Sequence, residues 1–295
     1  MNSSLHLCWA RGALRPRTDV RPALDERAFR YGDGVFTTLS LSRGLLLDAA
    51  LHMKRLRRSA SAIGLSVPDS VDTASSLARI LASMGVDGST DGVVRIQLSA
   101  GAGGRGYGRD RSADAWELVE VHAPAGERRL TVAILAEEEA PVPALPHVKS
   151  CSSLAHVMCA MAADRRGVVE AVRTTGNCLL EAAAGNLFWL ADGDLFTPSA
   201  TLPIYPGVTR SVVLETAREL EWTVHEGEFG AAGLTGAAGA FLVNAARGVE
   251  AIAELDGSPL DWPEKLEALR EAIDEARVRG STPVAGPSDR RPSVS

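Results

Sequence analysis

The chain has 295 residues, of which 45% are hydrophobic and 23% are charged, so it can form one large or two modest domains around a sizeable core. The net charge of −6 and the scattered basic residues give no reason to expect a nucleic-acid or membrane partner. No run approaches the ~20 apolar residues of a transmembrane helix, and the N-terminus lacks a secretory pattern. The four cysteines have no metal-ligand spacing, so we expect reduced thiols, no metal and a cytoplasmic location.

Residues 1–123 are expected to form a small N-terminal α+β domain. A helix is predicted over residues 48–65, because apolar residues recur there every three or four positions. The other expected elements, in chain order, are an edge strand within residues 1–24, a β-hairpin over residues 34–48 that turns at Arg43-Gly44, a helix over residues 70–84, a strand from Val93, and a strand over residues 115–123.

Residues 93–110, VVRIQLSAGAGGRGYGRD, run from an apolar segment into a glycine-rich loop. Gly101, Gly103 and Gly106 satisfy G-x-G-x-x-G, the spacing of a dinucleotide-binding turn, but that site needs a helix to start at the glycines. Here a second strand follows instead. The pattern therefore predicts a broad hairpin with Arg105 and Tyr107 at its tip, and it argues against a nucleotide site.

Residues 124–280 are expected to form a larger C-terminal domain, and the Pro/Ser-rich residues 281–295 to form a disordered tail. The elements predicted within the domain are strands over residues 130–138, 170–175, 186–198 and 241–255, and helices over residues 151–166, 208–222 and 261–280.

Lysine is scarce in this chain, which nevertheless keeps one in the middle of its sequence. The three lysines are Lys54, Lys149 and Lys265. A lysine in a dry pocket has a lowered pKa and can act as a Schiff-base amine, whereas a lysine at a strand end can simply extend into water. Both interpretations of Lys149 stay open from its sequence context.

Three further residues suggest one ligand. Glu181 is either a solvated turn residue or a partner for a buried ring nitrogen, and Thr209 is either an N-cap or part of a phosphate site at a helix N-terminus. Arg55 lies on a predicted helix beside the apolar stripe, where it is either solvated or a phosphate ligand. Together with a Schiff-base lysine, these residues match the aldehyde, the ring nitrogen and the phosphate of pyridoxal 5'-phosphate.

The chain resembles the fold-type IV pyridoxal-phosphate enzymes over roughly residues 25–260. The resemblance rests on an ordered set of segments: DERAFRYGDGVFTT, LHMKRLRRSA, Lys149, LLEAAAGNLFWL and YPGVTRSVVLE. It implies a branched-chain aminotransferase-like α+β fold of two domains, with the cofactor at the domain interface, and a homodimer. Lys149 would be the Schiff-base lysine, Glu181 would hold the pyridine nitrogen, and Arg55, Val208 and Thr209 would hold the phosphate.

Within that group the loop GGRGYG and the segments GDGVFTT and VNAARG resemble 4-amino-4-deoxychorismate lyase. The resemblance implies that Arg105, Tyr107 and Asn244 contact a substrate that carries carboxylates. Thr38, or its neighbour Thr37, would relay a proton.

Two departures from the pattern are KSCSS after the lysine and Ala245 in place of a phosphate-contacting threonine. The expected function is a lyase that makes 4-aminobenzoate and pyruvate. The alternatives are an aminotransferase acting on branched-chain or D-amino acids and a non-enzymatic nucleotide-binding protein.

Overall fold

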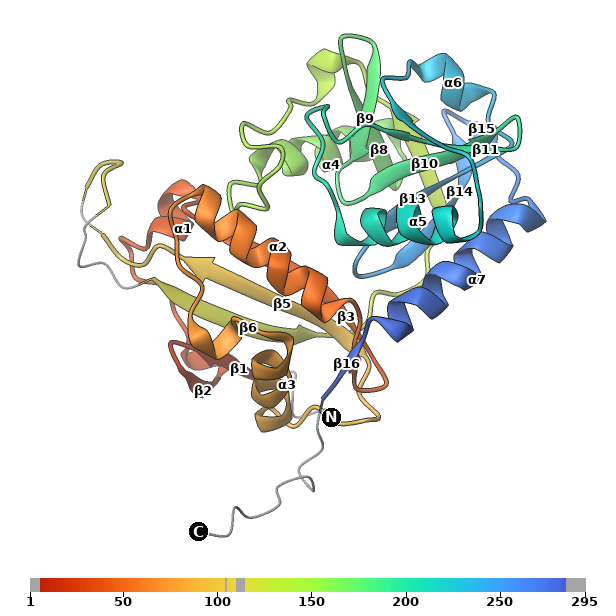
Figure 1. Ribbon diagram of the computed structural model, residues 1–295. Coiled ribbons are helices and arrows are strands. Elements are labelled where there is room, and N and C mark those ends of the chain that lie inside the picture. The colour runs from red at the N-terminus through yellow and green to blue at the C-terminus, as the bar shows by residue number, and fades with distance from the viewer. Residues whose placement is uncertain (1–5, 104, 110–114, 285–295) are drawn as a thin grey trace. The chain divides into compact units, whose positions relative to one another are not determined.

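The computed structural model describes residues 6–103, 105–109 and 115–284, and the chain divides into two compact units. Unit 1 contains Met1–Ala125, Val148–Ser152 and Val278–Ser295, and unit 2 contains Gly126–His147 and Ser153–Arg277. A single boundary was expected at residues 123–124. The structure adds two later segments to unit 1, Val148–Ser152 and Val278–Ser295. Each unit has its own sheet (Figure 1), and each has its own apolar core.

Unit 1 is built on a seven-stranded sheet with the strand order β16-β4-β3-β5-β6-β1-β2. Its strands are β1 (Leu7–Ala10), β2 (Ala13–Pro16), β3 (Gly34–Ser42), β4 (Leu45–Leu46), β5 (Gly92–Ser99), β6 (Trp116–His122) and β16 (Thr282–Pro283). Its helices are α1 (Arg27–Tyr31), α2 (Ala49–Ala62) and α3 (Ala74–Ser83), with the short 3-10 helices η2 (Arg17–Asp19) and η3 (Asp69–Val71).

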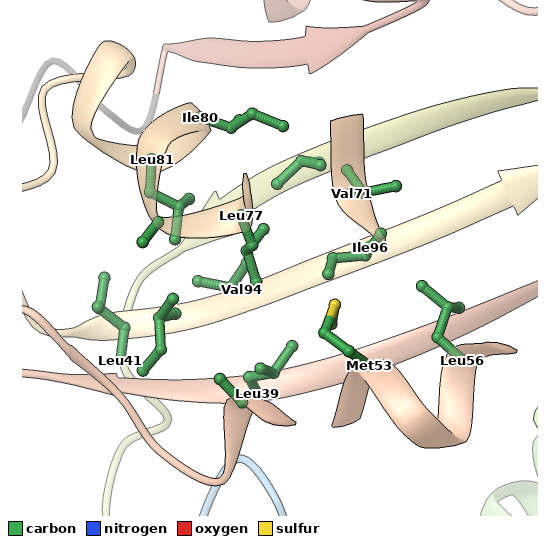
Figure 2. Packing of buried hydrophobic residues seen from close by; sticks show 14 of the residues in the cluster. Leu39, Leu41, Met53, Leu56, Val71, Leu77, Ile80, Leu81, Val94 and Ile96 are labelled. Atoms are coloured by element: carbon green, nitrogen blue, oxygen red, sulfur yellow. The ribbon is translucent and has the colours of Figure 1, made fainter. Parts of the chain in front are cut away.

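One face of this sheet packs on α2 and α3. Leu39 and Leu41 on β3 share one apolar cluster with Met53 and Leu56 on α2, and Figure 2 shows these side chains together with those of α3 and β5. The helical stripe predicted over residues 48–65 is confirmed, because its apolar positions lie in this cluster. Strand side chains alternate between faces, so the intervening residues of β3 and β5 lie on the other face of the sheet.

The glycine-rich loop joins two antiparallel neighbours. β5 pairs with β6 from Val93–His122 to Ser99–Trp116, and β6 is the next element after the glycines in the described chain. The expected hairpin is confirmed. The described residues do not form the helix that a dinucleotide-binding arrangement needs at that point.

The expectation of disorder from residue 281 was wrong for residues 281–284. β16 pairs with β4 at the sheet edge, and Val284 is buried in the core of unit 1. Backbone hydrogen bonding and one buried side chain outweigh the Pro/Ser-rich composition here. Residues 285–295 lie outside the described residues.

Unit 2 is built on a nine-stranded sheet with the order β12-β11-β10-β13-β14-β7-β8-β9, and β15 pairs with β14. Its strands are β7 (Leu130–Ile134), β8 (Glu170–Thr175), β9 (Cys178–Ala182), β10 (Asn186–Ala191), β11 (Asp194–Pro198), β12 (Val224–Gly227), β13 (Gly239–Asn244), β14 (Gly248–Leu255) and β15 (Ser258–Pro259). Its helices are α4 (Leu154–Arg166), α5 (Val208–Glu219), α6 (Ala231–Thr235) and α7 (Glu264–Arg279), the last reaching into unit 1 by two residues, with the 3-10 helix η4 (Glu137–Glu139).

α5 and α7 cover one face of the central strands β10 and β13, as Figure 1 shows, and the opposite face packs on α6. Strands β7, β9, β10 and β14 contribute to that second core, so the sheet curls. In the described part of the chain, no helix is long and apolar enough to span a membrane.

Two strands expected to be continuous are hairpins. The strand predicted over residues 186–198 turns at Asp192-Gly193, where both residues have positive φ, and forms β10 and β11. The strand predicted over residues 241–255 turns before Gly248, which has a φ of +68°. Aspartate-glycine is a common hairpin turn, so the sequence carried the first of these signals.

Candidate active site

In unit 1, a polar stripe on α2 lies beside the apolar stripe. His52, Arg55 and Ser59 follow spacings of three and four residues and are all buried. Arg55 Nη2 donates to Thr37 Oγ1 at 2.7 Å and lies 3.1 Å from His52 Nδ1, while Thr37 Oγ1 lies 3.0 Å from the same nitrogen. Thr37 and His52 therefore fix the direction of the Arg55 guanidinium.

The backbone of Lys149 is attached to the same helix and to β3. Its amide donates to Ser59 Oγ at 3.3 Å, its carbonyl accepts from the Phe36 amide at 2.9 Å, and Cys151 N donates to Gly34 O at 2.8 Å. On β3, the short strand β4 covers only Leu41 and Ser42, so it leaves this edge of β3 open near Gly34–Phe36. Residues 149–151 occupy that edge, one turn along α2 from Arg55.

The side chain of Lys149 lies on the sheet face that is turned away from α2. Its Nζ is 4.8 Å from the centroid of the Phe36 ring, and Arg95 Cζ lies 3.9 Å from the same centroid. Thr38 is directly opposite Arg95 in the β3–β5 register. Because alternate residues of a strand share a face, Thr38 is on the face of Phe36, whereas Thr37 faces His52 and Arg55.

Arg95 lies against the same ring as Lys149, and sequence reasoning did not single it out. Its guanidinium donates to Gln97 Oε1 at 3.2 Å, and its burial lowers the pKa of the side chain. The sequence signal was Arg95 two residues before Gln97 on the same predicted strand. The residues near Arg95 in the sequence do not indicate that Phe36 on the neighbouring strand lies beside it.

The loop that carries Arg105 and Tyr107 is anchored by Arg27, which is buried in α1. Arg27 donates to the carbonyl oxygens of Gly106, Tyr107 and Gly108 at 3.3, 2.8 and 3.0 Å, and to Asp33 Oδ2 at 2.7 Å. Arg105 itself is exposed. Arg27 thus holds the loop by its backbone, while the side chains of Arg105 and Tyr107 remain exposed.

Asp33 also forms an ion pair with a second arginine, Arg109, of the same loop. Arg109 pairs with both of its carboxylate oxygens and also donates to the carbonyl of Ile63 at 2.6 Å. These hydrogen bonds lower the pKa of Asp33, with that from Arg109 the larger effect. Tyr107 is 87% exposed and meets the Tyr31 ring edge-on at 5.7 Å between centroids.

In unit 2, one amide links Glu181 to the start of α5. Asn186 Nδ2 donates to Glu181 Oε2 at 3.1 Å and to the carbonyl of Tyr205 at 2.8 Å, while its Oδ1 accepts from Gly207 N at 3.2 Å. A Cβ at Gly207 would collide with Asn186 Oδ1. The carboxylate of Glu181 and the residue before Val208 are therefore held at a fixed separation.

The N-terminus of α5 has the properties of an anion site. Gly207 is its N-cap and contributes no side chain, and the helix runs for 12 residues from Val208. Thr209 Oγ1 is buried and has no hydrogen-bond partner among the described residues. Unsatisfied backbone N–H groups, the helix dipole and one spare hydroxyl together suit a phosphate.

Asn244 lies at the end of β13, and its amide is used within the turn to β14. Its Oδ1 accepts from Ala246 N and Arg247 N at 3.0 and 2.9 Å, and its Nδ2 donates to Glu250 Oε2 at 3.3 Å. These contacts define a turn-forming role, which the resemblance did not suggest. Ala245, where the resemblance implied a threonine, lies in the same turn. Its carbonyl oxygen accepts a hydrogen bond from Arg277 Nη2 on α7.

Known proteins match this chain over most of its length. Residues 34–255 match the family described as amino-transferase class IV. An aminodeoxychorismate lyase of Vibrio harveyi is 26% identical over 267 residues, which is 86% of this chain and 94% of the relative. A D-alanine aminotransferase of Listeria innocua is 27% identical over 255 residues, covering 83% of this chain and 86% of the relative.

The fold matches solved structures of the same group. The branched-chain aminotransferase of the archaeon Thermoproteus uzoniensis superposes with a TM-score of 0.84 at 24% identity and covers 95% of this chain and 99% of its own. A second branched-chain aminotransferase, in complex with N-(5'-phosphopyridoxyl)-L-glutamate, gives a TM-score of 0.83 at 21% identity with the same coverage. These matches extend over both sheets, so the fold is that of fold-type IV. The chain therefore belongs to the amino-transferase class IV family, whose enzymes use pyridoxal 5'-phosphate as cofactor.

Proposed function

We propose that this chain is a lyase that converts 4-amino-4-deoxychorismate to 4-aminobenzoate and pyruvate. The observation that carries the proposal is the shared sheet face of Thr38 and Phe36, with the Lys149 amine 4.8 Å from the centre of the Phe36 ring. A hydroxyl and an amine on one face provide two proton-transfer groups. The Vibrio harveyi relative, an aminodeoxychorismate lyase that aligns over 94% of its length, supports this choice.

The residues present fit the family's cofactor. In unit 2, the Thr209 hydroxyl and the N-terminus of α5 suit its phosphate, and the buried Glu181 carboxylate suits its ring nitrogen. In unit 1, the buried and oriented Arg55 guanidinium is a cation of the kind that binds a phosphate. When bound, pyridoxal 5'-phosphate supplies an aldehyde that condenses with amines and a ring that withdraws electrons. Lys149 is the residue that we propose binds it covalently.

Two side chains of this protein would then move protons. The Lys149 amine, freed when the amino group of the substrate takes its place on the cofactor, would remove the hydrogen from the substrate carbon that bears the amino group. The Thr38 hydroxyl would give a proton to the departing pyruvate. The hydrogen bonds of Thr37 to Arg55 and His52 favour Thr38 over Thr37 for that second role. Its part is to orient Arg55.

Two arginines are proposed to bind the carboxylates of the substrate. Arg105 lies exposed on the anchored loop, and Arg95 stacks on Phe36 beside Lys149. A planar guanidinium can bind a carboxylate with two parallel hydrogen bonds. An anion at Arg95 would also offset the repulsion between two cations that share one aromatic ring.

An aminotransferase is the second candidate, because D-alanine aminotransferases match the chain as closely as the lyase does. The two reactions differ in what they consume. A lyase releases pyruvate from aminodeoxychorismate with no second keto acid, whereas an aminotransferase needs one to complete its cycle. Pyruvate release measured with and without 2-oxoglutarate therefore separates them.

The covalent role of Lys149 is tested by borohydride reduction of the coloured protein followed by peptide mass analysis. We expect the adduct on Lys149 and the complete loss of turnover in Lys149→Ala. Lys54→Ala and Lys265→Ala are matched controls, since they are the only other lysines, and both should keep colour and activity. An adduct on Lys54 or Lys265 would overturn the assignment.

We also propose a homodimer. Helix α4 exposes four apolar side chains at helical spacing: Leu154, Val157, Met158 and Met161. A stripe of this kind is a common feature of a protein–protein contact. Met158→Glu should lower the molar mass measured by light scattering toward that of one chain, and an unchanged mass would remove α4 from the interface.

A further inference from the structure

Arg173 on β8 is a completely buried cation. Its side chain has 0% exposure, and its Nη2 lies 3.1 Å from Glu181 Oε1 on the adjacent strand β9. Its Nε and Nη1 have no hydrogen-bond partner among the described residues. Sequence reasoning passed over it, because EAVRTT was interpreted only as a short strand.

A buried arginine with two nitrogens that make no hydrogen bond is costly for the fold. Desolvation of a guanidinium is repaid only in part by one ion pair, and an apolar side chain of similar volume is often neutral or stabilising in such a place. The stability of unit 2 therefore does not account for an arginine at this position. Its effect on Glu181 is the remaining explanation.

An irregularity in the β8–β9 pairing brings the two groups together. Val172 is opposite Ala182 and Thr174 is opposite Leu179, so Arg173 alone faces the two residues Leu180 and Glu181. Such a bulge redirects a side chain. Leu179 and Ala182 both pack into one core, while the Glu181 carboxylate meets the guanidinium.

The carboxylate of Glu181 is thus held from two sides. Arg173 donates to Oε1 and Asn186 donates to Oε2, both at 3.1 Å. The other titratable groups nearby are Glu170 on β8 and Cys159 on α4, whose pKa is raised to about 11, chiefly by its burial.

We propose that Arg173 is a positioning residue that keeps Glu181 ionised and oriented toward the ring nitrogen of the cofactor. The inference rests on the proposed function for the identity of that ligand. The pairing itself depends only on the contact between the two side chains. Arg173 acts through Glu181 and does not itself touch the cofactor.

The pairing is tested first in the cofactor-free full-length protein. Arg173→Met and Glu181→Gln each leave one buried group without its partner, so each should lower the melting temperature by about 5–15 °C. The double variant removes both charges and should melt above either single variant. Arg129→Met is the matched control, because its pair with Glu254 is exposed, and it should change little. Additive losses in the double variant would overturn the pairing.

The positioning role is tested by the dissociation constant of pyridoxal 5'-phosphate. Arg173→Met should weaken binding by about ten- to a hundred-fold, Arg173→Lys should recover most of it, and Arg173→Met should have little further effect in the Glu181→Gln background. If Arg173→Met weakened cofactor binding equally in the wild-type and the Glu181→Gln proteins, the positioning role would be overturned. Unchanged affinity in all variants would also overturn it, while the Lys149 adduct tests the proposed function independently.

Discussion

Arg27→Met perturbs the glycine-rich loop without touching the side chains that we propose to contact substrate. Arg27 donates three hydrogen bonds to the backbone of residues 106–108, at 2.8, 3.0 and 3.3 Å. Methionine keeps the aliphatic packing but has no donor. The carboxylate of Asp33 keeps its other partner, Arg109, so the main loss is the attachment of the loop.

The size of the effect follows from the three carbonyl oxygens that accept from Arg27. Each hydrogen bond to an exposed carbonyl has a net value of about 1 kcal/mol, so losing three favours the detached loop by about 3 kcal/mol. A free-energy change of about 3 kcal/mol alters the ratio of attached to detached loop by about a hundred-fold.

The assay is the rate of trypsin cleavage after Arg105, because proteolysis follows the population of the open form when opening is fast. Arg30→Met is the matched control, since Arg30 is exposed on the same helix and its replacement also removes one trypsin site. The buried Arg210 reports global unfolding. Cleavage after Arg105 should rise by about ten- to a hundred-fold while cleavage after Arg210 stays slow. A rate within about threefold of that of Arg30→Met would refute the anchoring argument.

Four further outcomes are expected. Arg105→Lys should raise KM for aminodeoxychorismate about ten- to a hundred-fold with an unchanged visible spectrum, because lysine cannot form a bidentate contact; weakened cofactor binding with unchanged KM would assign the loop to the phosphate. Thr38→Val should lower kcat for pyruvate release, whereas Thr37→Val should weaken cofactor binding through Arg55, and the reverse pattern would exchange their roles. Desolvation of the half-buried Cys151 thiol raises its pKa to about 11, so iodoacetamide should modify this thiol slowly at pH 8, as followed by mass spectrometry; rapid modification would contradict the raised pKa. Burial also raises the pKa of Glu170 above 4.5, so its contribution to stability is complete below that pH and falls as pH rises through the folded-state pKa. The melting temperature of Glu170→Gln should therefore rise relative to that of the wild type as pH increases from 4.5. A difference between the two melting temperatures that does not change with pH would contradict the raised pKa.

The sequence by itself determined the local elements and the family. Helical spacing located α2, the Arg43-Gly44 turn located the hairpin of β3 and β4, and the strand pattern that follows the glycines argued against a dinucleotide site. These conclusions depend on contacts between residues close in the chain, which a periodic pattern reports directly. The ordered motifs indicated the family for the same reason, because each motif is a short local structure.

Only the tertiary structure decided which of these residues meet. Lys149 joins unit 1 because the short β4 leaves an edge of β3 open, and no residue near Lys149 signals this. Arg173 meets Glu181 because a bulge shifts the register of two strands, and Arg95 meets Phe36 across a sheet. Register and edge occupancy depend on every strand in the sheet, so they become fixed only when the whole sheet forms.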